Sequence, residues 1–203
     1  MMNADEALAR LREGNQRYVD NTTRLAEIND WQRRAELAKG QEPFAIILGC
    51  SDSRVPAEIV FDQGLGDLFV IRVAGNVVAP SLVGSVEFAA SQFGTPLVVV
   101  LGHSSCGAIR ATLDQLASCS ESPSPNLADI VERVRPAVAP LMERTPERPT
   151  AELMEEAVRA NVHASVRGLT AESPILAERV RDGRLKVVGA EYDLASGEVS
   201  FLE

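Results

Sequence analysis

Four short runs of apolar residues constrain the fold of this chain more than any other feature. They span residues 43–49, 67–73, 96–102 and 185–192, and Val and Ile are prominent in them. A run in which apolar residues do not alternate with polar ones is typical of a strand covered on both faces, as in a parallel sheet. We therefore expect each run to be a buried strand of a mostly parallel sheet.

Segments with helical periodicity separate these runs. They span residues 4–20, 82–93, 107–116, 126–142, 151–169 and 174–182. Pro136 and Pro140 should kink or interrupt the fourth of them. A turn at 193–197 should lead into a short antiparallel strand at 198–202. The chain is thus expected to have an α/β fold, with about four parallel strands and a short antiparallel edge strand flanked by helices.

The organisation along the chain points to one domain of 203 residues. No internal repeat and no long linker divides it. Residues 1–42 are expected to form an N-terminal helical arm. Residues 21–42 are polar and less regular and contain Trp31, so this segment should need another surface to pack against. Residues 43–203 read as the α/β core.

Charge and composition exclude several classes of function. The chain has 20 Lys and Arg against 29 Asp and Glu, a net charge of −9, which argues against nucleic acid and anionic membranes as partners. No stretch reaches the roughly 18 apolar residues of a membrane span. The first residues carry mixed charges without an apolar core, so no secretory signal is expected, and the three cysteines are too few and odd in number for a disulfide framework. These features predict a cytoplasmic protein with reduced thiols.

Chemically unusual residues follow two of the expected strands. Cys50 follows the first run, while His103 and Cys106 follow the third. Parallel strands end at the same edge of a sheet, where ligand sites lie, so we expect the three side chains to meet. Two thiolates and one imidazole suit Zn²⁺, and three protein ligands leave a fourth position that catalytic zinc keeps for water. Taken singly, each cysteine could instead be a buried core thiol.

Asp52 and Arg54 lie close to the expected site. Asp52 comes two residues after Cys50, so its carboxylate could reach the same ion, and Arg54 could hold that carboxylate in a bidentate pair. If Asp52 bound the zinc directly, it would exclude water. The alternative is a plain surface ion pair of little energetic value.

The motifs CSDSRV at residues 50–55 and GHSSCG at 102–107, with the closing segment VVGAEYDLASGEV, resemble those of the β-class carbonic anhydrases. The resemblance implies a zinc lyase that hydrates carbon dioxide reversibly to bicarbonate and a proton through zinc-bound hydroxide. It also implies a homo-oligomer built from dimers, in which N-terminal helices embrace the partner. By position, Cys50, His103 and Cys106 match the zinc ligands. Asp52 and Arg54 match the catalytic dyad, in which Asp52 binds zinc only in a closed form.

The same resemblance implies a substrate pocket. Its residues would be Gln41, Phe69, Ala74, Phe88 and Gly107. Ala74 and Phe88 stand where other members have valine and tyrosine, so the pocket should be roomier and lack a phenol. Ile47 stands where members with a non-catalytic bicarbonate site have tryptophan, so we do not expect that site.

Two other functions are compatible with the motifs. One is hydrolysis of another small linear molecule, such as carbon disulfide, on the same scaffold. The other is a zinc-binding protein without turnover, which would keep its metal capped by Asp52. Nucleotide binding is disfavoured, because residues 64–66 (GLG) lack the spacing of a phosphate-binding loop.

Overall fold

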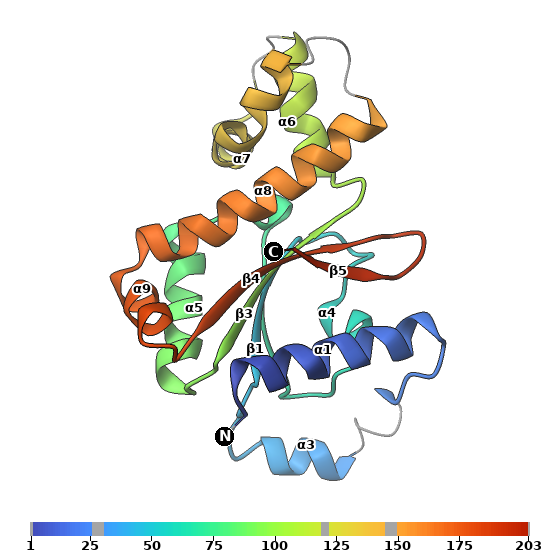
Figure 1. The fold of residues 1–203 in the computed structure, drawn as a ribbon, viewed down its shortest axis with the longest axis vertical. Helices are drawn as coiled ribbons and strands as arrows, with labels where there is room; N and C mark the ends of the chain where they lie inside the picture. The colour runs from blue at the N-terminus through green and yellow to red at the C-terminus, as the bar shows by residue number, and fades with distance from the viewer. Residues whose placement is uncertain (1, 26–30, 119–121, 145–149, 203) are drawn as a thin grey trace.

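The computed structural model describes residues 2–25, 31–118, 122–144 and 150–202. A five-stranded sheet forms its centre, in the order β2-β1-β3-β4-β5 (Figure 1). The strands are β1 (Ala45–Gly49), β2 (Leu68–Arg72), β3 (Leu97–His103), β4 (Lys186–Tyr192) and β5 (Val199–Leu202). β1 to β4 run parallel and β5 pairs antiparallel with β4, which confirms the expected α/β fold.

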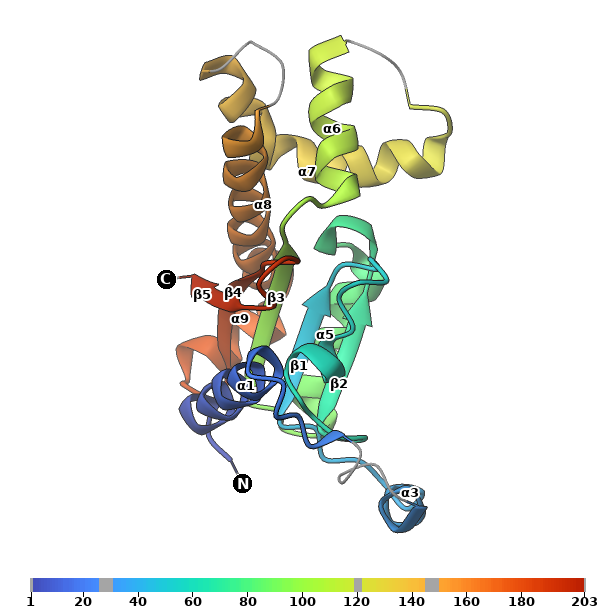
Figure 2. The same ribbon diagram turned by 90° about the vertical axis from the view of Figure 1, so that its right-hand side faces the viewer.

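Helices cover both faces of this sheet. The described helices are α1 (Ala4–Val19), α3 (Trp31–Leu37), α4 (Ala57–Val60), α5 (Pro80–Gln92), α6 (Gly107–Ser118), α7 (Pro125–Arg144), α8 (Ala151–Glu172) and α9 (Pro174–Arg181), of which five contact the sheet faces. α1 and α4 pack on one face, and α5, α8 and α9 on the other. α6 and α7 stand beyond the carboxyl ends of the strands, as Figures 1 and 2 show.

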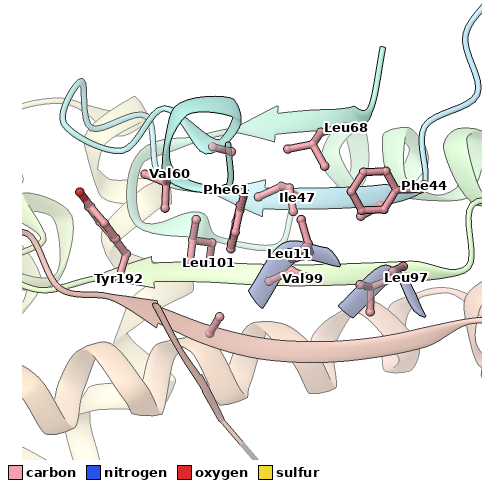
Figure 3. Packing of buried hydrophobic residues seen from close by; sticks show 14 of the residues in the cluster. Leu11, Phe44, Ile47, Val60, Phe61, Leu68, Leu97, Val99, Leu101 and Tyr192 are labelled. Carbon is pink, nitrogen blue, oxygen red and sulfur yellow. The ribbon is translucent and has the colours of Figure 1, made fainter. Parts of the chain in front are cut away.

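Alternate residues of the central strands point to opposite faces, as strand geometry requires. Ile47 and Val99 belong to the core beneath α1, and Figure 3 shows Leu11 of α1 packed over them. Ile46 and Val98 belong to the core beneath α5, α8 and α9. Every residue of β1 and β3 is buried, which explains why these strands read as continuous apolar runs.

The N-terminal segment has two parts with different environments. α1 begins with a capping box, in which Asn3 and Glu6 bind each other's backbone N–H groups, and it buries Ala7 and Leu11 against the sheet. α3 buries no residue, and Trp31 on it is 68% exposed. Figure 2 shows α3 at the edge of the molecule. The division into an arm (1–42) and a core (43–203) stays a prediction.

Local features depart from the sequence-based expectations. α7 covers the helix expected over 126–142 and runs through both Pro136 and Pro140, so neither proline interrupts it, while a kink there stays a prediction. Each proline removes only one helical N–H, and the buried residues Val134 and Val138 hold the helix in the core it shares with α6 and α8. α4 and a 3₁₀ turn at 74–76 were not expected, because four or three residues carry too little periodicity to detect.

No described helix has the length and apolar character needed to cross a membrane.

Close packing of α1 at Gly14 generates the first prediction. A Cβ added there would lie 1.8 Å from the Phe61 carbonyl oxygen, and this backbone atom cannot rotate away. We expect Gly14→Ala to lower the free energy of unfolding by about 3 kcal/mol. Urea denaturation at fixed protein concentration measures it.

Gly84→Ala is the matched control. Gly84 is an exposed glycine inside α5, and an added Cβ there would meet no described atom within 4 Å. Alanine should stabilise this helix by about 0.5–1 kcal/mol. Equal stability of the two variants would contradict the packing described for α1.

Candidate metal centre

The parallel sheet brings three predicted residues together. β1 and β3 are paired in register from Ile46 with Val98 to Gly49 with Leu101, so both strands end at one edge. Cys50 directly follows β1, His103 ends β3, and Cys106 precedes α6. One ligand atom from each of these three buried residues lies within 4.8 Å of the other two, and the two Sγ atoms are 3.9 Å apart.

The imidazole of His103 is arranged to bind a cation. Its Nδ1 is 2.9 Å from the carbonyl oxygen of Ser104, which can only accept, so Nδ1 carries the proton. The lone pair of the neutral ring is then on Nε2. This atom is buried and has no hydrogen-bond partner among the described residues. Two sulfurs and one nitrogen facing each other form the soft donor set of a zinc site.

The two thiols favour one negative charge between them. The hydrogen bond with Cys106 lowers the pKa of Cys50, and the N–H of Gly75, 3.4 Å from Sγ, lowers it further. The same hydrogen bond and the Cys50 charge raise the pKa of Cys106, and burial adds to the rise. A second thiolate therefore becomes stable only when a cation joins the pair, which fits a divalent metal.

Asp52 and Arg54 form the bidentate pair that the sequence predicts. Arg54 donates from Nε to Oδ1 of Asp52 at 2.9 Å and from Nη2 to Oδ2 at 2.7 Å. The Arg54 side chain is 56% exposed, whereas that of Asp52 is only 17% exposed. Oδ2 of Asp52 lies 3.8 Å from Nε2 of His103. The pair therefore differs from an ordinary surface ion pair, because its carboxylate faces a ligand atom.

Arg54 also sets the charge of this carboxylate. Its hydrogen bonds hold the pKa of Asp52 well below the usual range for a carboxyl group. Asp52 is therefore ionised throughout the neutral pH range.

Arg72 contributes to the site although the sequence analysis assigned it no role. It ends β2 and donates to the carbonyl oxygens of Cys50 at 3.0 Å and Asp52 at 2.5 Å. These bonds fix the backbone that carries a ligand and the dyad carboxylate. The sequence feature that could identify Arg72 is its place at the end of the second apolar run, since a parallel strand must end at the same edge as β1 and β3.

The 3₁₀ turn beside the thiols depends on Gly75. Its φ of +71° is readily available to glycine, and a Cβ there would lie 3.0 Å from that of Ala108. Asn161 of α8 donates to the Gly75 carbonyl at 2.8 Å. Thus α8 holds the turn whose N–H group points at Cys50.

The predicted pocket residues separate into two groups. Ala74 and Gly107 lie beside the ligands and line a largely apolar cavity of about 510 Å³ between α6 and α7. Gln41 precedes β1, and Phe69 pairs with Ile46 near the amino end of that strand. Phe88 of α5 stacks near Phe69, with ring centroids 6.3 Å apart, and is 53% exposed. β1 separates this second group from its own chain's metal ligands by roughly 15 Å.

The remaining histidine is not part of the described cluster. His163 is half-buried in α8, outside the described ligand set. Cys119 lies outside the described residues.

Comparison with known proteins agrees with this geometry. A family profile described as "Carbonic anhydrase" matches residues 45–199. Carbonic anhydrase 2 of Mycobacterium tuberculosis is 43% identical over 187 residues, which cover 92% of this chain and 87% of that relative.

Solved structures show the same relationship. The β-carbonic anhydrase CcaA superposes with a TM-score of 0.75 at 26% identity, over 96% of this chain and 91% of that one. One of two enzymes of the fungus Sordaria macrospora, described as tetrameric β-carbonic anhydrases, superposes with a TM-score of 0.68 at 26% identity, over 83% and 85% of the chains. With its Cys-His-Cys zinc-type cluster at the sheet edge, this chain belongs to the β-class carbonic anhydrase family.

Proposed function

We propose that this protein hydrates carbon dioxide reversibly to bicarbonate and a proton, with zinc as its cofactor. The observation that carries the proposal is the buried cluster of Cys50, His103 and Cys106, in which Nε2 of His103 lacks a partner. When bound, zinc supplies the Lewis acidity that brings the pKa of a water molecule near neutrality. All other steps belong to residues of the chain.

Asp52 and Arg54 act as the dyad of this reaction. Ionised Asp52 is an acceptor only, so its Oδ2 would accept a hydrogen bond from the attacking water and orient that water's lone pair toward carbon dioxide. Arg54 supports this role, because its two hydrogen bonds fix both carboxylate oxygens. In a closed form, Asp52 would leave Arg54 and occupy the fourth metal position.

The cavity between α6 and α7, whose wall includes Gly107 next to Cys106 in the chain, suits a small apolar substrate. Ala74, Gly107 and Ala108 contribute little polar surface to its wall. Carbon dioxide has no charge and needs no strong hydrogen bond to enter such a site. Bicarbonate, in contrast, is an anion that the apolar wall would release.

A second subunit would complete the pocket. Gln41, Phe69 and Phe88 lie at the opposite end of β1 from the metal ligands of their own chain, and Phe88 is exposed. We propose a homo-oligomer built from dimers, in which Gln41 of the partner subunit reaches the substrate. The ligand cysteines are free thiols, which suits a reducing compartment, and we propose the cytoplasm.

Removal of a ligand should remove the metal. We expect His103→Ala and Cys106→Ala to reduce zinc from about one ion per chain to near zero, because two remaining donors cannot complete a tetrahedral site. Elemental analysis of purified protein measures this. His163→Ala, which removes the other histidine, should retain the full zinc content, and zinc retained in Cys106→Ala would contradict the assignment.

The dyad predicts a loss of rate without loss of metal. Asp52→Asn keeps the shape of the side chain but removes the charge that Arg54 fixes, and we expect kcat for carbon dioxide hydration to fall about 100-fold. Stopped-flow assays from neutral to alkaline pH measure it. The wild-type rate should rise with pH, and this rise should not come from Asp52, which is already ionised at neutral pH.

Asp129→Asn is the matched control for the dyad. Asp129 also forms a bidentate pair with an arginine, Arg133, but on the exposed surface of α7. Its substitution should leave the rate unchanged. A normal rate in Asp52→Asn would remove that residue from the mechanism, and zinc-loaded wild-type protein without hydration activity at any pH would reject the proposed function.

Subunit mixing tests whether Gln41 acts across the interface. Gln41→Ala and Cys106→Ala should each be weakly active alone. When the two are coexpressed, a mixed dimer has one site with intact ligands and Gln41 of the partner subunit. Random pairing should then restore roughly a quarter of the wild-type activity. Mixed dimers no more active than the two parents would show that Gln41 does not act in trans.

A further inference from the structure

Ser104 connects a metal ligand to a distant turn of the chain. Its carbonyl oxygen accepts the Nδ1 proton of His103 at 2.9 Å. Its backbone N–H donates to the carbonyl of Tyr192 at 2.9 Å, and its Oγ accepts the N–H of Leu194 at 2.9 Å. Thus the residue whose carbonyl orients His103 is held at its N–H group and at its hydroxyl by the end of β4 and the segment after it.

The segment that holds Ser104 is itself rigid. Asp193 closes the turn between β4 and β5, because its carboxylate accepts the N–H groups of Ala195 at 3.0 Å and Ser196 at 2.7 Å. Its own N–H donates to the Glu198 carbonyl at 2.9 Å. Hydrogen bonds from Ser196, from the N–H of Ala195 and from the side chain of Ser104 lower the pKa of Asp193. The turn therefore keeps its charged acceptor at neutral pH.

Helix α1 fixes the same turn from the other side. The side chain of Asn15 is buried, donates to the Gly197 carbonyl at 2.9 Å and accepts the N–H of Val199 at 2.8 Å. The turn is therefore anchored to the helix layer as well as to the sheet. It offers Ser104 a support that does not depend on the loop carrying Cys106.

We propose that Ser104 is a positioning residue for the metal centre, which holds the His103 ring so that Nε2 faces the two thiols. Every residue has a backbone carbonyl, so the specific contribution of Ser104 is its hydroxyl, which fixes that carbonyl to the turn. A ring whose second nitrogen is already held loses less freedom when it binds a metal. This inference rests on the metal site of the proposed function.

The neighbouring serine provides an internal contrast. Ser105 is exposed and has a φ of +56°, so the chain changes direction there. Among the described residues the Ser105 hydroxyl has no hydrogen-bond partner, whereas that of Ser104 accepts the N–H of Leu194 in the turn. Removing each hydroxyl in turn separates positioning of His103 from a general effect of changing this loop.

Zinc affinity of the full-length protein tests the inference without reference to catalysis. Metal-free protein would be titrated with zinc in competition with a chromophoric chelator, and Co²⁺ would be bound as a spectroscopic probe of ligand geometry. We expect Ser104→Ala to weaken zinc binding about 10-fold and to alter the visible Co²⁺ absorption bands. Ser104→Thr, which keeps the hydroxyl, should restore both, and Ser105→Ala should resemble the wild type.

Asp193→Ala, which removes the Oδ1 atom that accepts the N–H groups of Ala195 and Ser196, extends the test to the turn while Ser104 stays intact. It should weaken zinc binding, and its effect should be less than additive with that of Ser104→Ala because both act through one contact. Wild-type affinity and spectrum in a folded Ser104→Ala variant, or an equal loss in Ser105→Ala, would overturn the inference. If Ser104→Ala does not fold, wild-type zinc affinity in Asp193→Ala would overturn it. Because zinc binding is measured without carbon dioxide, an inactive wild type would not affect these outcomes.

Discussion

Parallel pairing of β1 with β3 is the constraint on which the metal centre depends. Cys50 and His103 are 53 positions apart in sequence, and neither has a local reason to meet the other. The register from Ile46 with Val98 to Gly49 with Leu101 brings the ends of both strands to the same edge. Hydrophobic burial maintains this pairing, because all residues of the two strands are buried between helix layers.

Several hydrogen bonds between side chains and backbone groups then fix the loops that carry the three ligand atoms. Arg72 fixes the carbonyl groups around Cys50, and Asn161 holds the turn that directs the Gly75 N–H at the same sulfur. Ser104 orients His103 and is itself held by the segment after β4. Arg72, Asn161 and Leu194 lie outside the two motifs, so other parts of the fold contribute to the arrangement of the three ligand atoms.

Much of this could be predicted from the sequence, for identifiable reasons. β1 and β3 could be predicted because burial on both faces produces continuous apolar runs, and the ligand cluster follows from the rule that parallel strands share an edge. The run that forms β2 has only one buried residue of five, so the expectation of a strand buried on both faces is wrong there. Which of the two expected effects Pro136 and Pro140 have on the helix over 126–142 could not be decided from the sequence, since it depends on tertiary packing of Val134 and Val138. The contacts of Arg72 and Ser104 need atomic geometry, because the partners of their side chains are backbone groups, which every residue type carries. The location of Gln41 and Phe88 away from their own ligands depends on which end of the sheet each segment reaches.

X-ray absorption at the zinc edge of the purified protein tests the central claim most directly. A metal held by Cys50, His103 and Cys106 predicts two sulfur atoms at about 2.3 Å and one imidazole nitrogen at about 2.0 Å, with one lighter atom completing the tetrahedron. A first shell with only nitrogen and oxygen, or with a single sulfur, would contradict the account.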